Sequence, residues 1–322
     1  MKMKKSLLNL ITKTFLFVCL ISCSSILKAN CQQELPAIIG RWDITMNANG
    51  KQIPSWLEVQ LSGTRTLVGQ FVGSGGSARP ISKINFSDGK INFSIPPQWD
   101  SQNSDLIFEG TLSNDNLSGT ITLPSGEKYN YTAVRAPSLN RTTEIKWSKA
   151  KALFDGKDLS GWHPSGDVNQ WVVENGILRS PKPGSNLITD EKFTDFKLHV
   201  EFRCAETGNS GVYLRGRYEV QIIDSKTSEH EPYKNGLGSV YGFLQPNQEA
   251  GKAAGEWQSY DITLIGRTVT IVLNGKTIIC SAIIPGITGG ALDGNEGEPG
   301  PIMFQGDHEP IEYRNITITT PQ

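Results

Sequence analysis

The 322-residue chain has few long runs with the 3.6-residue apolar periodicity that marks amphipathic helices. Its apolar residues instead alternate with polar ones in short runs, and 33 Gly and 17 Pro supply turns between them. Lys and Arg number 31 against 32 Asp and Glu. The chain therefore lacks the excess of basic residues that nucleic-acid binding requires. We expect an all-β protein without a nucleic-acid partner.

Several chemical motifs are also missing. No C-x-x-C pair is present, which argues against a structural zinc site, and no G-x-S-x-G elbow supports a serine hydrolase. The Gly-rich run 289–301 precedes no expected helix, so it is not a phosphate cradle and is interpreted as a mobile loop beside a site. Cys204 and Cys280 fall on expected strands, where they either pair in an oxidising compartment or are buried thiols.

The one long apolar run lies at the N-terminus and is typical of an export signal. Residues 1–5 are basic and the apolar segment after them is too short to span a bilayer comfortably. Residues 20–23, Leu-Ile-Ser-Cys, resemble a bacterial lipobox, which predicts a signal peptide over 1–22 and lipidation of Cys23. Cleavage after Ala29 is the alternative and would release a soluble protein. Both interpretations predict an exported protein, which is either periplasmic or anchored to the outer membrane. Any contact with the membrane would be made through the lipid on Cys23.

Two β domains follow. Residues 36–135 contain alternating strands punctuated by hairpin dipeptides, which suits a small up-and-down barrel. Its opening Gly40-Arg41-Trp42 resembles the start of lipocalin-like barrels. We expect an accessory domain or spacer, with a ligand-holding calyx as the alternative. Residues 136–150 are interpreted as a linker, and 151–320 as a second all-β domain of sandwich or jelly-roll type.

Nine ordered segments of the second domain carry a specific resemblance. They are "LFDGKDLSGW" (153–162), "WVVENGIL" (171–178), "FTDFKLHVEFR" (193–203), "NSGVYLRG" (209–216), "YEVQIID" (218–224), "GSVYGF" (238–243), "GEWQSYDI" (255–262), "LNGK" (273–276) and "GPIMFQGDHEPIEYRNI" (300–316). Together they resemble the 3-keto-disaccharide hydrolase domain family over about residues 150–320. One departure is Glu309, which stands where that family frequently has Gly.

The resemblance implies a concanavalin-like jelly roll and an enzyme acting on glycosides whose sugar is oxidised to a ketone at C3. Related proteins are described as hydrolases or as lyases that eliminate the aglycone. A 3-keto group acidifies the C2 proton, so a base can remove it, an enediolate develops and the C1 aglycone leaves. Such a site needs a base near C2, donors or a cation for the enediolate, and an acid near the leaving oxygen.

Polar residues on one side of the expected strands match these needs. We expect the strands to be neighbours in one concave sheet, so that their polar sides form a common floor. That floor would combine His199, Glu201, Tyr213, Arg215, Glu219 and Gln221 with Gln305, Asp307 and His308 from a late loop.

Each of these residues has a chemical and a structural interpretation. Arg215 is a candidate enediolate stabiliser or a salt-bridge partner on the strand. Glu219 is a candidate base or acid, or a partner for an arginine. His308 is the best single acid–base candidate, with Asp307 orienting it or facing water. Glu201 is a further catalytic candidate unless it only extends a polar network of the sheet.

The remaining candidates would bind substrate. Gln221, Gln305, Tyr213 and His199 offer polar groups to sugar hydroxyls. Tyr241 and Trp257 are candidate aromatic platforms, with burial in the core as the alternative for both. Trp162 and Trp171 are expected in the core.

No cofactor is expected. A divalent metal ion stays open, because Glu201, Glu219, Asp307 and His308 together contain suitable donors, although their spacing matches no recognised metal motif.

We therefore expect an exported enzyme that cleaves 3-keto-glycosides or 3-keto-disaccharides, by elimination through C2 or by net hydrolysis. The alternatives are a non-catalytic carbohydrate-binding jelly roll and a glycosidase that acts on unoxidised sugars through two carboxylates.

Overall fold

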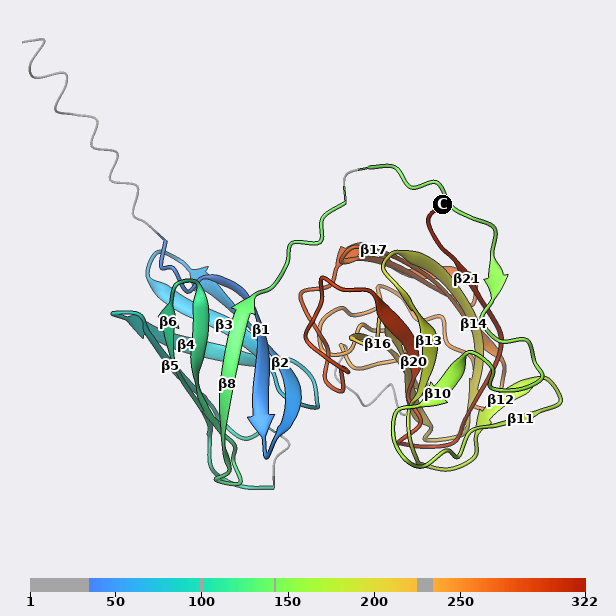
Figure 1. The fold of residues 1–322 in the computed structure, drawn as a ribbon, viewed down its shortest axis with the longest axis horizontal. Helices are drawn as coiled ribbons and strands as arrows, with labels where there is room; N and C mark the ends of the chain where they lie inside the picture. Colours follow the sequence, from blue (N-terminus) through green and yellow to red (C-terminus); the bar gives the residue numbers. More distant parts are fainter. Residues whose placement is uncertain (1–34, 99–100, 142, 225–233) are drawn as a thin grey trace, which may run out of the picture. The chain divides into compact units, whose positions relative to one another are not determined.

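The computed structural model describes residues 35–98, 101–141, 143–224 and 234–322. Within these ranges the secondary structure is entirely β (Figure 1), as the alternating sequence predicts. No helix in these ranges is long and apolar enough to cross a membrane. Residues 38–322 cluster as one compact unit. The predicted signal segment and Cys23 lie outside the described residues.

The first eight strands close into the predicted barrel. They run in consecutive antiparallel order, and β8 pairs back with β1. Their bounds are β1 Gly40–Ala48, β2 Lys51–Ser62, β3 Thr66–Val72, β4 Arg79–Ser87, β5 Lys90–Ile95, β6 Leu106–Ser113, β7 Asn116–Thr122 and β8 Lys128–Arg135. Asn49, Asp88 and their following glycines adopt positive φ, the conformation that two-residue hairpin turns require.

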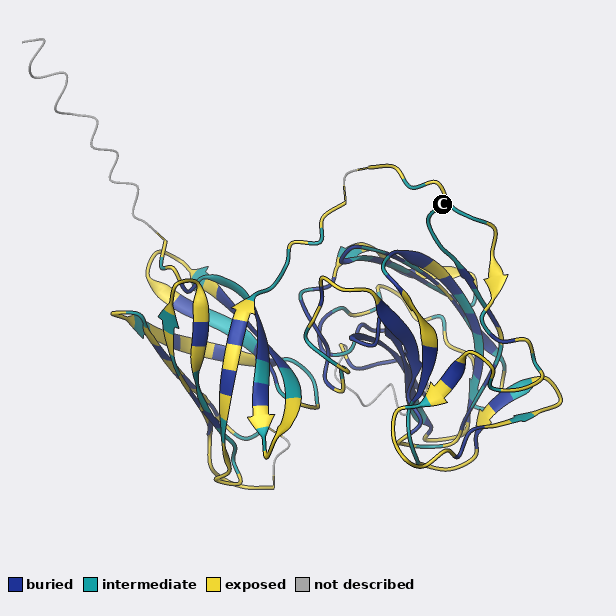
Figure 2. Ribbon diagram, in the orientation of Figure 1, coloured by how far each residue is buried: buried dark blue, intermediate teal, exposed yellow. Residues whose placement is uncertain are grey.

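The barrel interior is filled by its own side chains. Buried inward-facing residues alternate with more exposed ones along β5, β6 and β8, and the striped colouring of β8 in Figure 2 shows this pattern. Phe93 and Phe108 stack at 4.5 Å, and Tyr131 lies 4.6 Å from Phe108. This packing favours the accessory-domain interpretation over a ligand-holding calyx.

The second domain is a two-sheet sandwich. A five-stranded sheet has the order β10-β13-β20-β15-β16, and a second sheet has the order β11-β12-β21-β14-β17-β18-β19 with β9 paired to β21. The bounds are β9 Lys151–Ala152, β10 Trp162–Pro164, β11 Val172–Glu174, β12 Ile177–Ser180, β13 Leu187–Phe193, β14 Phe196–Cys204, β15 Asn209–Leu214, β16 Tyr218–Ile223, β17 Gln258–Ile265, β18 Thr268–Leu273, β19 Lys276–Ile283, β20 Gly300–Phe304 and β21 Ile311–Thr319.

A single apolar core lies between the two sheets. Trp162 and Trp171 are both in it, as predicted, with Trp162 stacked 5.0 Å from Phe304. Cys204 is buried in this core and Cys280 is exposed on β19, and both are free thiols. The alternative of a disulfide between them is therefore wrong.

Candidate active site

The β15–β16 hairpin carries the polar centre of the five-stranded sheet. Val212 and Val220 are paired across the hairpin and face the sandwich core, so their neighbours Tyr213 and Glu219, also paired, face the opposite side. The Tyr213 hydroxyl lies 3.0 Å from Oε2 of Glu219. Both side chains are almost completely buried.

A glycine on β15 makes room for the Glu219 carboxyl. Gly211 pairs with Gln221, and a Cβ at Gly211 would lie 2.5 Å from Oε1 of Glu219. A glycine inside a strand marks such a close approach. This residue was visible in the sequence as the third letter of "NSGVYL", although it was not predicted as part of the site.

Burial makes Glu219 a weak acid. Desolvation raises its pKa from 4.5 to about 8, against the opposing effects of the Tyr213 hydroxyl and the nearby His308, while Asp307 raises it further. Burial and the neighbouring Glu219 raise the pKa of Tyr213 well above 10. Glu219 is therefore mostly protonated at neutral pH, with a hydroxyl as its immediate partner.

An imidazole and a second carboxylate lie on the loop after β20. Nδ1 of His308 is 2.8 Å from Oδ1 of Asp307. This hydrogen bond raises the pKa of His308 above 6.5 and lowers the pKa of Asp307 below 3.8. Both side chains are partly exposed, at 42% and 49%. The loop thus adds a solvent-accessible acid–base pair that interacts electrostatically with buried Glu219.

Two glutamines add unused hydrogen-bonding atoms. Gln221 and Gln305 are buried, and within the described residues neither side-chain oxygen has a hydrogen-bond partner. Gln221 follows Glu219 on the same side of β16, and the backbone N–H of Gln305 donates to the Gly211 carbonyl. Buried polar atoms without partners are uncommon in folded proteins. These two oxygens are suitable acceptors for sugar hydroxyls.

Tyr241 also lies beside this centre. Its amide donates to the Glu219 carbonyl at 3.0 Å, and its side chain interacts electrostatically with Tyr213. The structure therefore brings together seven of the predicted residues, namely Tyr213, Glu219, Gln221, Tyr241, Gln305, Asp307 and His308.

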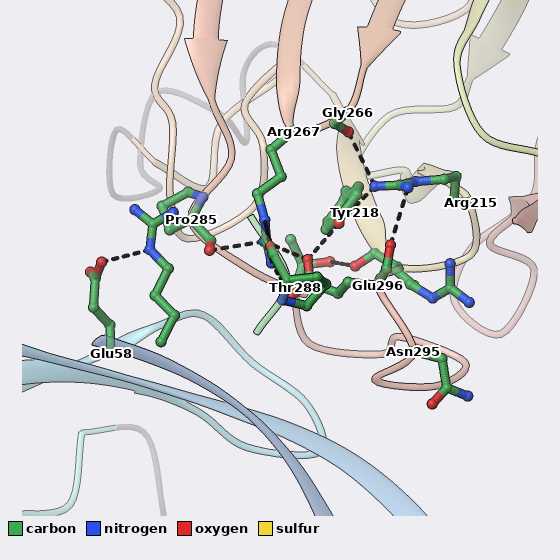
Figure 3. Close-up of polar contacts among 12 residues, drawn as sticks. Glu58, Arg215, Tyr218, Gly266, Arg267, Pro285, Thr288, Asn295 and Glu296 are labelled. Atoms are coloured by element: carbon green, nitrogen blue, oxygen red, sulfur yellow. Dashed lines mark hydrogen bonds and ion pairs between the residues drawn. The ribbon is translucent and has the colours of Figure 1, made fainter. Parts of the chain in front are cut away.

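The expectation that Arg215 shares a face with Glu219 is wrong. Arg215 occupies the hairpin turn with φ of 54°, which ends the strand alternation on which the expectation relied. Its guanidinium donates to the Tyr218 hydroxyl and the Gly266 carbonyl at 2.9 and 3.1 Å. Figure 3 shows it inside a buried polar network with Glu296. Arg215 therefore lies among structural partners.

The 289–301 run contributes to the same network. Glu296 is fully buried, accepts two hydrogen bonds from Arg267 and accepts one from Tyr218 (Figure 3). The run does lie beside the site, since the Gly289 carbonyl is 2.9 Å from the Tyr213 hydroxyl. It is tightly bonded at both places, contrary to the expected mobile loop.

The expectation of one common floor also fails for β14. This strand belongs to the other sheet, between β17 and β21, so its polar side faces away from Glu219. His199 bonds Asp261 there, and Glu201 accepts hydrogen bonds from Arg314 and Asn315. The error arose because sequence neighbours in a jelly roll often join different sheets.

Trp257 lies with these outward-facing residues. The guanidinium groups of Arg203 and Arg314 lie 4.8 and 3.9 Å from its ring centroid. It is therefore part of a surface cation–π cluster on the second sheet. Because Glu201 is also remote, the four residues considered as donors for a metal ion do not lie together. The described residues contain no cluster of three His, Cys, Asp or Glu side chains suited to a metal.

Comparisons with known proteins match this second domain. The model of a family described as 3-keto-alpha-glucoside-1,2-lyase-like domain matches residues 149–319, more than half of the chain. A 3-keto-disaccharide hydrolase from Bacteroides thetaiotaomicron is 23% identical over 165 residues, covering 39% of this chain and 56% of that protein. The match therefore spans little more than half the length of this curated relative.

Solved structures give similar matches. A candidate glycosyl hydrolase from Parabacteroides distasonis is 34% identical, with a TM-score of 0.46, and covers 53% of this chain and 83% of its own. Another from the same organism is 25% identical, with a TM-score of 0.43, and covers 53% and 98%.

Proposed function

The chain belongs to the 3-keto-alpha-glucoside-1,2-lyase-like domain family, and from this premise we propose that it cleaves glycosides whose sugar carries a ketone at C3. The observation that carries the proposal is the buried Glu219 carboxyl, whose pKa burial raises to about 8, beside the Tyr213 hydroxyl, together with the His308–Asp307 pair that interacts with Glu219 electrostatically. This arrangement supplies a hydrogen-bond donor and a base of different pKa within one site.

We assign the base to His308. Asp307 holds one ring nitrogen by its hydrogen bond, so the other nitrogen is available to accept the C2 proton. The imidazole must be neutral to do so, which requires a pH above its raised pKa. Removal of this proton drives electrons into an enediolate, whose negative charge develops on the C3 oxygen.

Glu219 takes the role that the sequence suggested for Arg215. A carboxylic acid kept neutral by burial donates a hydrogen bond to a developing oxyanion. Gln221 and Gln305 would accept hydrogen bonds from sugar hydroxyls and orient the ring.

Elimination then completes the reaction. The C1–oxygen bond breaks, a C1=C2 double bond forms, and the proton held by the imidazolium passes to the leaving aglycone oxygen. Addition of water across the double bond would turn the same step into net hydrolysis.

The test compares 3-keto-trehalose and 3-keto-sucrose with their unoxidised parents, each with and without chelator, and follows aglycone release. We expect release only from the keto sugars. The eliminated product has no hydrogen on C2, so solvent deuterium should appear at C2 only in the product that has added water across the double bond. His308→Ala should lower turnover about 10²-fold or more, the range typical of general acid–base catalysis. Release from the parent sugars would refute the elimination chemistry. No release from any sugar would leave a carbohydrate-binding protein.

We also propose that the protein acts outside the cytoplasm, because residues 1–22 have the pattern of an export signal that is followed directly by Cys23. Cell fractionation of the wild-type chain and of Cys23→Ser tests this. Lipidation predicts that the wild-type protein partitions with membranes and that the variant does not. Cytoplasmic recovery of both proteins would refute export.

A further inference from the structure

The outward side of the barrel is buried along three strands. Asp43 on β1, Trp56 on β2 and Val72 on β3 are paired neighbours that point away from the barrel interior, yet each is at most 7% exposed. Trp56 and Val72 belong to the apolar core cluster of the sandwich domain. The barrel and the sandwich therefore share part of one core.

Trp56 is packed closely against the sandwich. Its ring lies 5.3 Å from that of Phe243 in an edge-on arrangement, and a Cβ at Gly286 would lie 2.2 Å from the indole. Such a fit requires glycine at position 286. It fixes the barrel at the segment that leads to residues 288–292.

The barrel's β3–β4 loop, residues 73–78, lies against that segment. The Gly290 amide donates to the Ser74 carbonyl at 3.1 Å, and a Cβ at Gly289 would lie 2.3 Å from the Gly76 carbonyl oxygen. The loop has the sequence Gly-Ser-Gly-Gly-Ser-Ala, so it brings no charge to the contact. It covers residues 289–290 with uncharged backbone.

The segment that the loop covers, residues 289–290, includes the carbonyl that bonds Tyr213 in the active site. Tyr213 has one hydroxyl proton and two neighbours, Oε2 of Glu219 at 3.0 Å and the Gly289 carbonyl at 2.9 Å. A carbonyl only accepts, so Tyr213 satisfies both contacts when it donates to Gly289 and a protonated Glu219 donates to Tyr213. An ionised Glu219 would compete for the same proton and leave the Gly289 carbonyl without it.

From these contacts we propose that Trp56 and the β3–β4 loop are positioning elements of the active site, which fix the Gly289 carbonyl so that Tyr213 donates to it and Glu219 keeps its proton. The inference rests on the proposed role of Glu219. The proposal gives the barrel, which lies outside the matched family region, a direct role in positioning the active site.

The groups that act on Glu219 come from two other elements. Tyr213 faces it from β15, and His308 and Asp307 interact with it from the loop after β20. Residues 288–292 and 73–78 contain no ionisable side chain. Displacing the barrel loop would therefore change the pKa of Glu219 in two ways, by admitting water to the site and by disturbing the Gly289–Tyr213 contact. The charged groups around Glu219 would stay the same.

The experiment titrates Glu219 directly in the full chain. Glutamate labelled with ¹³C at the side-chain carboxyl reports its ionisation by NMR, and Glu219→Gln identifies the signal by its loss. Gly289→Ala adds a methyl group whose three nearest atoms all belong to Gly75 and Gly76 of the barrel loop, and Trp56→Ala removes the anchoring ring. Both should lower the pKa of Glu219 by about 1 or more, because hydration favours the carboxylate.

Two matched controls separate positioning from stability. Gly75→Ala alters the same loop where a Cβ meets nothing within 4 Å, and Phe93→Ala removes an aromatic ring from the barrel's own interior. Neither should move the pKa of Glu219. An unchanged pKa in Gly289→Ala and Trp56→Ala, or an equal fall in Phe93→Ala, would overturn the proposal. Because this readout needs no turnover, it stays separate from the test of substrate cleavage.

Discussion

Asp43 gives a prediction about stability that can be worked through in numbers. It is 7% exposed, and burial together with the adjacent Glu296 raises its pKa from 3.8 to about 9. The folded chain therefore takes up a proton at Asp43 that the unfolded chain lacks above pH 3.8. This group contributes its full stability below pH 3.8, and the contribution is lost as pH rises until the folded carboxyl ionises at about pH 9.

Asp43→Asn removes the need for that proton. The amide keeps a donor for the hydrogen bond to Glu296 and has nearly the same shape as the protonated acid. Each pH unit above 3.8 corresponds to about 1.4 kcal/mol, so the variant should be more stable than the wild-type chain by up to about 4 kcal/mol at pH 7. The difference should be small near pH 4 and should grow with pH.

Urea unfolding at pH 5, 7 and 8.5, followed by tryptophan fluorescence, measures this difference. Asp88→Asn is the matched control, because Asp88 is exposed in a barrel turn and both residues tolerate its positive φ. The control should show no pH-dependent change. A variant that is less stable than wild type at pH 8.5, or a difference that does not vary with pH, would refute the reasoning.

Three further substitutions test the geometry of the site. Gly211→Ala should lower turnover about 10-fold or more while the chain stays folded, because the new methyl group displaces the Glu219 carboxyl; wild-type turnover would contradict the close contact. Glu201→Gln should leave turnover unchanged, because Glu201 bonds Arg314 on the other sheet. A 10²-fold loss of turnover in the same assay would show that Glu201 takes part in catalysis. Arg215→Met should lower the midpoint of thermal unfolding, because it leaves the Gly266 and Glu296 carbonyls without their donor, but it should not change the pH dependence of turnover. A changed pH profile in that variant would contradict its structural assignment.

Local patterns were sufficient to predict the strands and the barrel. Alternation and Asn-Gly or Asp-Gly dipeptides specify hairpins through interactions between residues close in sequence. Tyr213 and Glu219 were placed together for this reason, because one hairpin fixes their register. The closed order β1 to β8 follows from consecutive hairpins in the same way.

Long-range arrangement was not predictable from these patterns. Whether β14 joins the sheet of β15 depends on how the two layers of the sandwich are connected, and alternation is the same in either case. Arg215 was misplaced because strand periodicity was extended into a turn residue with positive φ. The contact between Ser74 and Gly290 joins residues more than 200 positions apart. It is made by backbone atoms, which every residue has, so the residue types at these positions do not predict it.

The pH dependence of kcat/KM for a 3-keto disaccharide tests the central claim most directly. The wild-type protein should give a bell-shaped profile, rising through the raised pKa of His308 and falling near pH 8 as Glu219 ionises. Glu219→Gln should lower the maximum about 10²-fold and abolish the fall near pH 8. A wild-type rate in this variant, or the same basic limb in both proteins, would contradict the assignment of Glu219 as the protonated group of the site.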